Sequence, residues 1–247
     1  MLTSAQITQF QTDGFLSFEQ LIRGQKLSRY IDLFDRLMEQ SRTTPIGTPH
    51  WSFELNEERE QNPDLLHKVQ GVGVVEPGVI DLAKESEILD RIQPLLGENL
   101  DVFGTKFFPK LPGGGTSVFW HQDNFYFGTQ STQIISWSIY YQDSDTENGC
   151  LRLVPKSHVI GEILPHHSGP DSYGSWVEEE VDESEVLDVE VPAGTAVIFS
   201  ANLLHGTYPN ISDRSRYSTA WHYIPGNLDL AHFPRGEYED RHIVRGV

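Results

Sequence analysis

The hydrophobic pattern of the first hundred residues has the period of α-helices. Apolar side chains fall on one helical face in residues 25–40 and again in residues 80–97, where Gly97 supplies a stop signal. Both segments are therefore predicted to be amphipathic helices. We expect this part of the chain to form a layer of helices joined by loops.

Two further segments of this region carry start, stop or loop signals. Residues 3–14 begin with an N-cap candidate, Thr3 or Ser4, and end at Gly14, which predicts another helix. Residues 42–63 are rich in proline and polar side chains. Because this stretch is too long for an ordinary connection, we expect a functional lid or a surface excursion there.

From about residue 101 the pattern changes to short segments rich in β-branched and aromatic residues. Each is bounded by Gly, Pro, Asn or Asp, and the predicted strands are 101–110, 117–127, 133–143, 187–191, 195–200 and 216–224. Many short strands without intervening helices are typical of an antiparallel sandwich or barrel. Since no flexible linker divides the chain, we expect one mainly β domain with a mainly helical layer in 1–100, a β core in 101–225 and a C-terminal extension in 226–247.

The composition narrows the range of partners. Hydrophobic residues make up 38% of the 247 residues, which is enough for a sizeable core. Asp and Glu number 36 against 18 Lys and Arg, and the net charge of −18 argues against nucleic acid or an anionic membrane as a partner. The same charge disfavours long-range capture of anionic substrates, although a local basic pocket could override it.

Cysteine usage and hydropathy exclude other classes. Cys150 is the single cysteine, which rules out an intrachain disulfide and a zinc site built from several cysteines. The chain has no signal-like N-terminus and no apolar run of the length that a membrane span needs. We therefore expect a cytoplasmic protein.

Candidate chemistry lies in the predicted strand 117–127. Residues i and i+2 of a strand point to the same face, so His121 and Asp123 can project together. His205, which follows an apolar strand, is the best candidate for a third ligand. Two histidines and one carboxylate suit non-haem Fe(II) in oxygenases. The alternative for the His-x-Asp pair alone is a hydrogen-bonded histidine beside a surface aspartate.

Arg216 adds a reason to expect a ketoacid. It lies eleven residues after His205, and its guanidinium fork suits the far carboxylate of a ketoacid that chelates iron. Arg214 competes for this role, and either arginine could instead lie in a surface turn. Thr207, two residues after His205, could add a hydroxyl donor.

Four stretches share their motifs with one known family. They are ITQFQTDGFL, the HQD at 121–123, QIISWSIYYQDSDTENGCLRLVPKSH, and LLHGTYPNISDRSR with its histidine and arginine. Together they resemble the phytanoyl-CoA dioxygenase (PhyH) family of Fe(II)/2-oxoglutarate oxygenases, and the resemblance extends over most of the chain. The resemblance implies that iron is bound by His121, Asp123 and His205, and that Arg216 grips the C5 carboxylate of 2-oxoglutarate.

The resemblance also points to three further contacts with this cosubstrate. Thr207 occupies the hydroxyl position after the distal histidine, and Trp137 stands where the family has a tryptophan that lines the cosubstrate pocket. Lys106 falls at a cosubstrate-contacting position that is not lysine in the human enzyme. It is either a second cation for 2-oxoglutarate or a surface lysine.

The implied fold is a double-stranded β-helix, a cupin-like jelly roll, with the N-terminal helices packed on one sheet. The implied activity is that of a non-haem Fe(II)- and 2-oxoglutarate-dependent dioxygenase. It would use O2 to hydroxylate a small-molecule metabolite or natural-product intermediate, with release of succinate and CO2. Desaturation, epimerisation and endoperoxide formation use the same iron site and stay open. Asp123 argues against halogenation, because related halogenases lack this carboxylate.

Two functions of other kinds also stay open at this point. One is a non-catalytic jelly-roll protein that binds a metabolite, and the other is a cupin-like isomerase or hydrolase with a different metal. Arg216 would have no evident use in the second. The aromatic run Phe125, Tyr126 and Phe127 either lines a substrate pocket or packs in the core.

Overall fold

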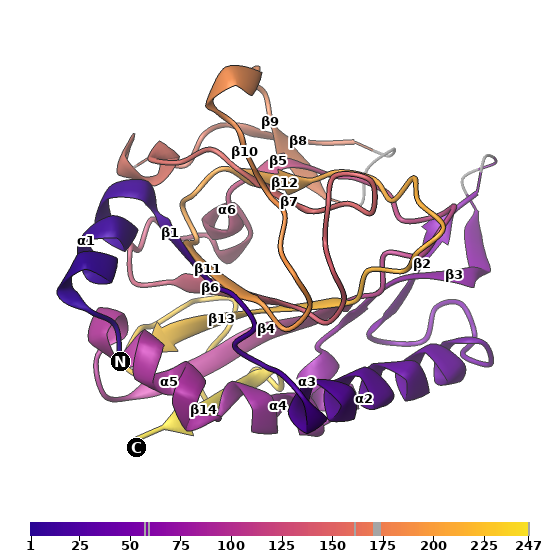
Figure 1. Cartoon of the computed structure of the whole chain (residues 1–247), viewed down its shortest axis with the longest axis horizontal. Helices are drawn as coiled ribbons and strands as arrows, with labels where there is room; N and C mark the ends of the chain where they lie inside the picture. The colour runs from indigo at the N-terminus through magenta and orange to yellow at the C-terminus, as the bar shows by residue number, and fades with distance from the viewer. Residues whose placement is uncertain (57, 59, 161, 170–173, 247) are drawn as a thin grey trace.

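A larger and a smaller antiparallel sheet face each other, and helices cover the outer face of the larger sheet (Figure 1). This arrangement is seen in a computed structural model that describes residues 1–56, 58, 60–160, 162–169 and 174–246. No helix among these residues is long and apolar enough to cross a membrane. The predicted mainly β fold with a helical layer on one sheet is confirmed.

In the described part of the chain, the larger sheet runs in the order β1 (Phe15–Phe18), β11 (Ala196–Ser200), β6 (Ile135–Tyr140), β13 (Ser218–Pro225), β4 (Leu100–Phe108), β3 (Gln61–Gln70) and β2 (Trp51–Leu55), while β14 (Arg241–Arg245) also pairs with β4. The strands β6 and β11 are buried at every position. They are buried because helices cover one face of this sheet and the smaller sheet covers the other.

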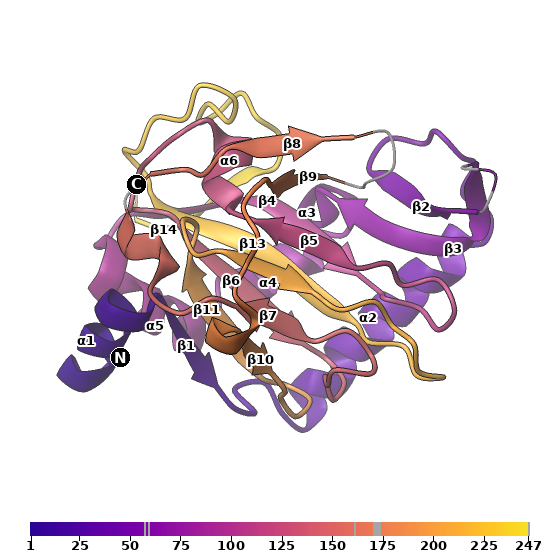
Figure 2. The same ribbon diagram turned by 90° about the horizontal axis from the view of Figure 1, so that it is seen from above.

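The smaller sheet has the order β10 (Leu187–Val189), β7 (Leu151–Leu153), β12 (His205–Thr207) and β5 (Val118–His121), and Figure 2 shows it from above. From β4 to β13 the chain crosses repeatedly from one sheet to the other. This alternation is the winding of a double-stranded β-helix, so the implied jelly roll is confirmed. The short strands β8 (His166–Ser168) and β9 (Ser175–Val177) pair with each other beside β5.

The helical layer consists of α1 (Ser4–Asp13), α2 (Gln25–Ser41), α3 (Val72–Val75), α4 (Gly78–Ala83) and α5 (Ser86–Leu96). The signals at both ends of α1 act as predicted. The Thr3 hydroxyl accepts a hydrogen bond from the Gln6 N–H, and the Gln6 side chain accepts one from the Thr3 N–H, which is a capping box. Gly14 ends the helix with a φ of +84°, a conformation that glycine adopts without steric cost.

The helix α2 buries the face that its pattern predicts. Leu33, Phe34 and Leu37 are buried, and Phe34 stacks on Phe107 of β4 with 4.5 Å between ring centroids. Such an aromatic pair adds about 0.5–1.5 kcal/mol beyond the burial of its area. The helical layer and the larger sheet therefore share one hydrophobic core.

Residues 1–100 contain more strand than their pattern indicates. The strands β2 and β3 pair at the edge of the larger sheet, so the lid or surface excursion expected over 42–63 is wrong for 51–55 and 61–63. Phe53 and Leu66 face each other across this pair and are both buried. Their tertiary contacts stabilise strands in a stretch whose composition is that of a loop. Residues 57 and 59 of the expected lid lie outside the described residues.

The helix predicted over 80–97 is divided into α4 and α5. Glu85 is extended, with φ −57° and ψ 132°, and it precedes the first turn of α5. The change of direction allows Leu82 of α4 and Ile92 of α5 to be fully buried in the same core. Gly97 ends α5, as its position after the last apolar residue predicts.

The C-terminal segment is tied to β4 by buried polar contacts. The carboxylate of Asp101, which is fully buried, lies 2.9 Å from Nε of Arg241 and 3.0 Å from Nε of Arg235. Asp240 accepts hydrogen bonds from the N–H and the hydroxyl of Thr105, at 2.6 and 2.7 Å. These contacts hold the strand that forms one wall of the site described next.

Candidate active site

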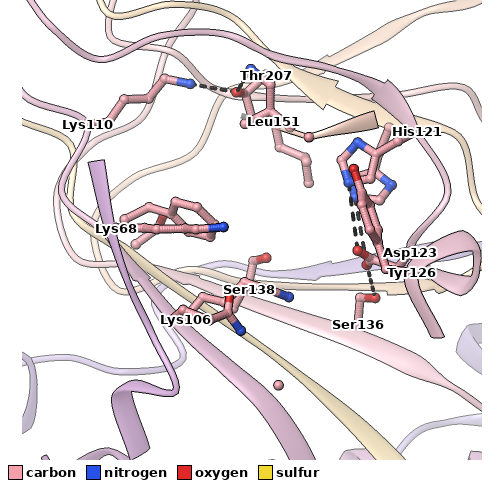
Figure 3. Close-up of a pocket in the computed structure, with 18 of the residues that line it drawn as sticks. Lys68, Lys106, Lys110, His121, Asp123, Tyr126, Ser136, Ser138, Leu151 and Thr207 are labelled. Carbon is pink, nitrogen blue, oxygen red and sulfur yellow. Dashed lines mark hydrogen bonds and ion pairs between the residues drawn. The ribbon is translucent and has the colours of Figure 1, made fainter. Parts of the chain in front are cut away.

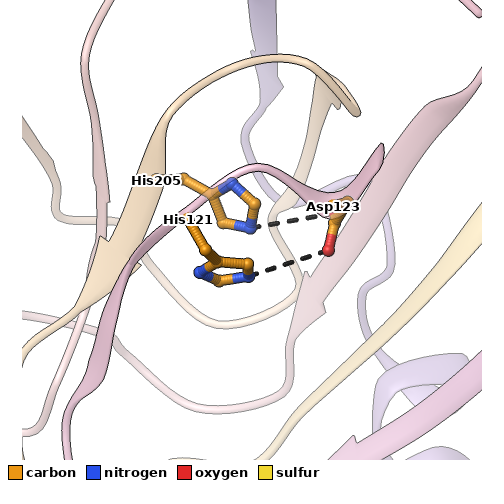
Figure 4. Close-up of side chains that lie close together, drawn as sticks. All are labelled: His121, Asp123 and His205. Carbon is orange, nitrogen blue, oxygen red and sulfur yellow. Dashed lines mark ion pairs between the residues drawn. The ribbon is translucent and has the colours of Figure 1, made fainter. Parts of the chain in front are cut away.

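The pairing of β5 with β12 places His121 and His205 directly opposite each other, with 4.1 Å between their ring centroids. The strand β5 ends at His121, and Asp123 begins the short helix α6 (Asp123–Phe127). The prediction that both residues lie on one continuous strand is therefore wrong. The extended residue between them, Gln122, nevertheless turns the Asp123 carboxylate towards the two imidazoles (Figure 4).

The three side chains form a compact set of donors. The Nε2 atoms of His121 and His205 lie 3.7 and 3.8 Å from the two carboxylate oxygens of Asp123. All three side chains are buried, and their ligand atoms lie within 4.8 Å of one another. The Nδ1 atoms are hydrogen-bonded to the carbonyls of Phe119 and Leu203, so the Nε2 lone pairs point at Asp123. This donor set fits Fe(II).

The protonation states suit metal binding. Burial acts to raise the pKa of Asp123, but the surrounding imidazoles of His222, His205 and His121, together with the amine of Lys106, hold that pKa well below its usual range. Burial, reinforced by the charge of His121, lowers the pKa of His205 to about 4. An ionised carboxylate and a neutral imidazole are the forms that ligate metals.

A cavity of about 300 Å³ opens beside these residues, between the two sheets (Figure 3). This volume is at the lower end of the range for small-molecule sites. The polar side chains that line it beyond the three donors include Lys68, Lys106, Lys110, Thr207, Arg216 and Ser218.

The structure distinguishes Arg216 from its competitor. Arg216 is only 3% exposed, its guanidinium lies over the ring of Tyr140, and its Nη1 donates a hydrogen bond to the Ser218 hydroxyl at 2.5 Å. No carboxylate of the described residues pairs with it, and its Nε has no hydrogen-bond partner among them. Arg214 is instead exposed and pairs with Asp145 at 2.8 Å. A buried arginine without a counterion fits an anionic ligand.

The sequence profile described as phytanoyl-CoA dioxygenase (PhyH) matches residues 10–218. The chain belongs to this family. The ectoine dioxygenase of Nocardia farcinica is 25% identical over 230 residues, which are 85% of this chain and 73% of that protein. The probable alpha-ketoglutarate-dependent hypophosphite dioxygenase of Stutzerimonas stutzeri is 24% identical over 174 residues, 68% of this chain and 60% of that relative. Membership confirms the expected enzyme class, an Fe(II)- and 2-oxoglutarate-dependent oxygenase.

Solved structures share the fold of this PhyH-family chain. EctD from S. alaskensis, with 2-oxoglutarate and 5-hydroxyectoine, superposes with a TM-score of 0.73 at 18% identity, covering 96% of this chain and 83% of EctD. The non-heme monooxygenase ThoJ gives 0.73 at 23% identity, with 97% and 83% covered. The epimerase SnoN gives 0.67 at 18% identity, with 88% and 81% covered. At these identities the likeness shows the common jelly roll.

Two of the other expected cosubstrate residues line the cavity of this PhyH-family chain. The Thr207 hydroxyl accepts hydrogen bonds from Nζ of Lys110 at 2.5 Å and from the Val118 N–H at 3.1 Å. Lys106 lies on β4, and its Nζ donates to Nε2 of His222 at 2.9 Å. The lysine that lies beside Thr207 is therefore Lys110 and not Lys106. The sequence motifs did not indicate Lys110 as a site residue.

The structure does not bring Trp137 to the cavity, so its expected role in the cosubstrate pocket is corrected. Ser136 and Ser138 of β6 line the cavity, and side chains alternate along a strand. Trp137 therefore faces the helical layer, where its ring packs against those of Phe18 and Tyr223. It is a core residue, which is the alternative role of a tryptophan on a β-strand.

Sequence reasoning missed the residues that support Asp123. The Ser136 hydroxyl donates to Oδ2 of Asp123 at 2.6 Å and also lies 3.1 Å from Nδ1 of His222. A signal for Ser136 was present, because it and Ser138 are polar at alternate positions of an otherwise apolar strand. Nothing in the sequence connects His222, one residue after a buried tryptophan, to this site.

The aromatic run after Asp123 was expected either to line a substrate pocket or to pack in the core, and its residues divide between the cavity wall and packing away from it. Tyr126 and Phe127 line the cavity. Phe125 instead stacks on the ring of His166 of β8, with 4.2 Å between centroids. The short helix α6 thus contributes both to the cavity wall and to the packing around it.

Proposed function

We propose that this chain is a non-haem Fe(II)- and 2-oxoglutarate-dependent dioxygenase that hydroxylates a small-molecule metabolite or natural-product intermediate. One observation carries the proposal. A single cavity contains a buried set of two histidines and one carboxylate together with the uncompensated guanidinium of Arg216. The first suits Fe(II), and the second suits the far carboxylate of 2-oxoglutarate.

In this proposal His121, Asp123 and His205 hold the iron and leave other coordination positions to small ligands. Iron, when bound, would activate O2 as the oxidant, and 2-oxoglutarate would supply two electrons through its decarboxylation to succinate and CO2. The protein positions the donor groups and excludes water from them. Ser136 fixes the carboxylate of Asp123, and the surrounding sheets keep bulk water away from the buried donors.

The cosubstrate carboxylate would lie against Arg216. The Ser218 hydroxyl orients the guanidinium, and the amine of Lys110, which donates to Thr207, is a second hydrogen-bond donor in the same cavity. Charge-assisted hydrogen bonds from a guanidinium fork fix both the position and the orientation of a carboxylate. These contacts would present the keto acid end of 2-oxoglutarate to the three metal ligands.

A small substrate follows from the size of the cavity. Its volume of about 300 Å³ has to hold the cosubstrate as well as the reacting part of the substrate. The matched relatives named for ectoine and hypophosphite support a compact substrate. Hydroxylation is the preferred outcome over halogenation because the Asp123 carboxylate fills the position that a halide would need.

Anaerobic addition of Fe(II) and then 2-oxoglutarate tests the proposal. We expect the visible metal-to-ligand charge-transfer band of the chelate, followed by succinate when oxygen is admitted. A protein that forms neither band nor succinate would instead be a non-catalytic metabolite binder. A protein that prefers another metal and shows no dependence on 2-oxoglutarate would fit a cupin-like isomerase or hydrolase.

A further inference from the structure

Phe119 and Tyr126 form an aromatic wall of the cavity beside the proposed metal ligands. They line the cavity from β5 and α6, and they remain 50% and 40% exposed. Phe119 shares a face of β5 with His121, the second residue after it. The ring of Tyr126 lies edge-on to that of His121, with 5.6 Å between centroids. Figure 3 shows Tyr126 beside His121 and Asp123, across the cavity from Lys68.

The polar group of this wall is already engaged within the protein. The Tyr126 hydroxyl accepts a hydrogen bond from the Ser175 N–H at 2.8 Å and donates its proton to the Ser175 carbonyl at 3.1 Å. Burial raises the pKa of Tyr126, which keeps this hydroxyl protonated. A ligand therefore meets the ring of Tyr126 and not a free donor.

The strand β9 holds both rings in place. Ser175 begins this strand, and the ring of Trp176, the next residue, lies against that of Phe119 with 5.9 Å between centroids. Gly174 leaves room for the Tyr126 hydroxyl, because a Cβ at this position would lie 2.7 Å from it. Rings that are fixed before a ligand arrives lose little conformational entropy when it binds. The aromatic wall is therefore preorganised.

The aromatic wall differs in chemistry from the part of the cavity assigned to the cosubstrate. Arg216 and Lys110 supply polar donors there, together with Thr207 and Ser218. Apart from the proposed metal ligands, the lining residues described from β5, α6 and β9 carry no charged side chain. Covering exposed aromatic surface is favourable, and a second aromatic ring gains ring–ring contacts beyond the buried area.

Charged groups fit this wall poorly. The carboxylates of the described lining are Asp123, which belongs to the metal set, and Glu54. The Glu54 carboxylate accepts from the Thr116 hydroxyl at 3.0 Å and lies 3.0 Å from Nδ1 of His67. A cation would thus lack a counterion, and an anion would lie against the negative faces of the rings. A neutral ring fits best.

We propose that Phe119 and Tyr126 bind a neutral aromatic ring of the substrate, so that the substrates of this oxygenase are small aromatic compounds. The inference rests on the proposed function, because it assigns the second occupant of the same cavity. A ring against Tyr126 is held next to His121, which brings its substituents within reach of the metal. Phe119, the more exposed of the two, extends the wall towards the opening. The oxidation itself is that of the proposed function and needs no further reactant.

The test titrates ring compounds into the whole chain loaded anaerobically with Fe(II) and saturating 2-oxoglutarate. Benzamide is the probe, cyclohexanecarboxamide is the saturated control and tetramethylammonium is the cationic control. Both the charge-transfer band and the melting temperature are followed. We expect benzamide to bind saturably and about threefold or more tightly than cyclohexanecarboxamide, and tetramethylammonium not to bind.

Variants of the two rings locate the binding. Phe119→Ala and Tyr126→Leu should each weaken benzamide binding about tenfold, through loss of an aromatic contact. Tyr126→Phe keeps the ring and should stay within about threefold of the wild-type affinity. Ile211→Ala, which removes an exposed apolar side chain that does not line the cavity, is the matched control with wild-type affinity.

Several results would overturn the inference. Benzamide could fail to bind the wild-type protein, either control compound could bind as tightly, or the Phe119→Ala/Tyr126→Leu double variant could keep wild-type affinity. Equal losses in Tyr126→Phe and Tyr126→Leu would mean that the attachment to Ser175 matters and the ring contact does not. Phe119→Leu is the second variant if Phe119→Ala does not fold. A wild-type protein without a charge-transfer band would contradict the proposed function itself, while its melting temperature still reports benzamide binding.

Discussion

Ser136 donates a hydrogen bond to Asp123, with 2.6 Å between Oγ and Oδ2, although the two residues lie on different elements of the fold. The Ser136 oxygen also lies 3.1 Å from Nδ1 of His222. The other ring nitrogen of His222, Nε2, lies 2.9 Å from Nζ of Lys106. Because a lysine ammonium can only donate, Nδ1 of His222 carries the ring proton and donates it to Ser136. A directed chain of hydrogen bonds thus leads from the cavity wall to the carboxylate.

Ser136→Ala should weaken iron binding about 10- to 100-fold, the usual effect of removing the partner that orients a metal ligand. Anaerobic titration with Fe(II) in the presence of 2-oxoglutarate measures it. Ser138→Ala is the matched control, since it lies on the same face of the same strand but makes no contact with Asp123 that would be lost. Equal iron affinity for Ser136→Ala and the wild type would show that Asp123 needs no such support.

Asp123→Ala should abolish turnover and most iron binding, because it leaves two neutral imidazoles without the charged ligand. Iron content after gel filtration and succinate formation are the measurements. Asp229→Ala, which removes an exposed carboxylate, should keep both at the wild-type level. Retained iron and full activity in Asp123→Ala would refute the proposed ligand set.

Arg216→Ala should raise the concentration of 2-oxoglutarate needed for half-maximal charge-transfer absorbance by about tenfold or more, since a charged donor to the carboxylate is lost. The exposed Arg214→Ala is the control and should leave that concentration unchanged. The opposite pattern, in which only Arg214→Ala requires more 2-oxoglutarate, would mean that the buried guanidinium has another ligand.

His121, Asp123 and His205 could be proposed as one donor set from the sequence, because their chemical types and spacing form a specific combination. The geometry of the three side chains could not be predicted from the sequence. That β5 ends at His121, and that Asp123 starts a helix, depends on how β5 pairs with β12. A single short strand carries no information about its register with a distant partner. The residue set was therefore predictable, while the way Asp123 reaches it was not.

The sequence likewise does not predict which face of each strand lines the cavity. On β6, alternation separates Trp137 from Ser136, but the sequence does not say which side becomes core and which becomes cavity. The large ring of Trp137 packs on the side of the helical layer, and the hydroxyl of Ser136 contacts Asp123 on the cavity side. Lys68 follows the stretch 42–63 and belongs to no element that the sequence predicts, so its place in the cavity is shown only by the β3–β4 pairing.

The burial of Lys68 in the cavity wall has a consequence for stability with a definite sign. The pKa of Lys68 is lower in the folded state than its ordinary value of 10.5, so the charged amine disfavours folding below pH 8 and the penalty is relieved as the pH rises above 8. Lys68→Met should therefore melt at a higher temperature than the wild type at pH 7 without anions. A lower melting temperature would mean that the ammonium is already compensated in the free protein.

Asp101→Asn should lower the free energy of unfolding by about 3–5 kcal/mol, the cost of leaving a buried charge without its partner. Asp101 is fully buried, and its partner Arg241 joins the C-terminal segment to the strand that carries Lys106. Urea denaturation of the metal-free protein measures the loss, and the exposed Asp229→Asn should stay within about 0.5 kcal/mol of the wild type. If Asp101→Asn were equally neutral, β14 would hold its place through the β4 ladder alone.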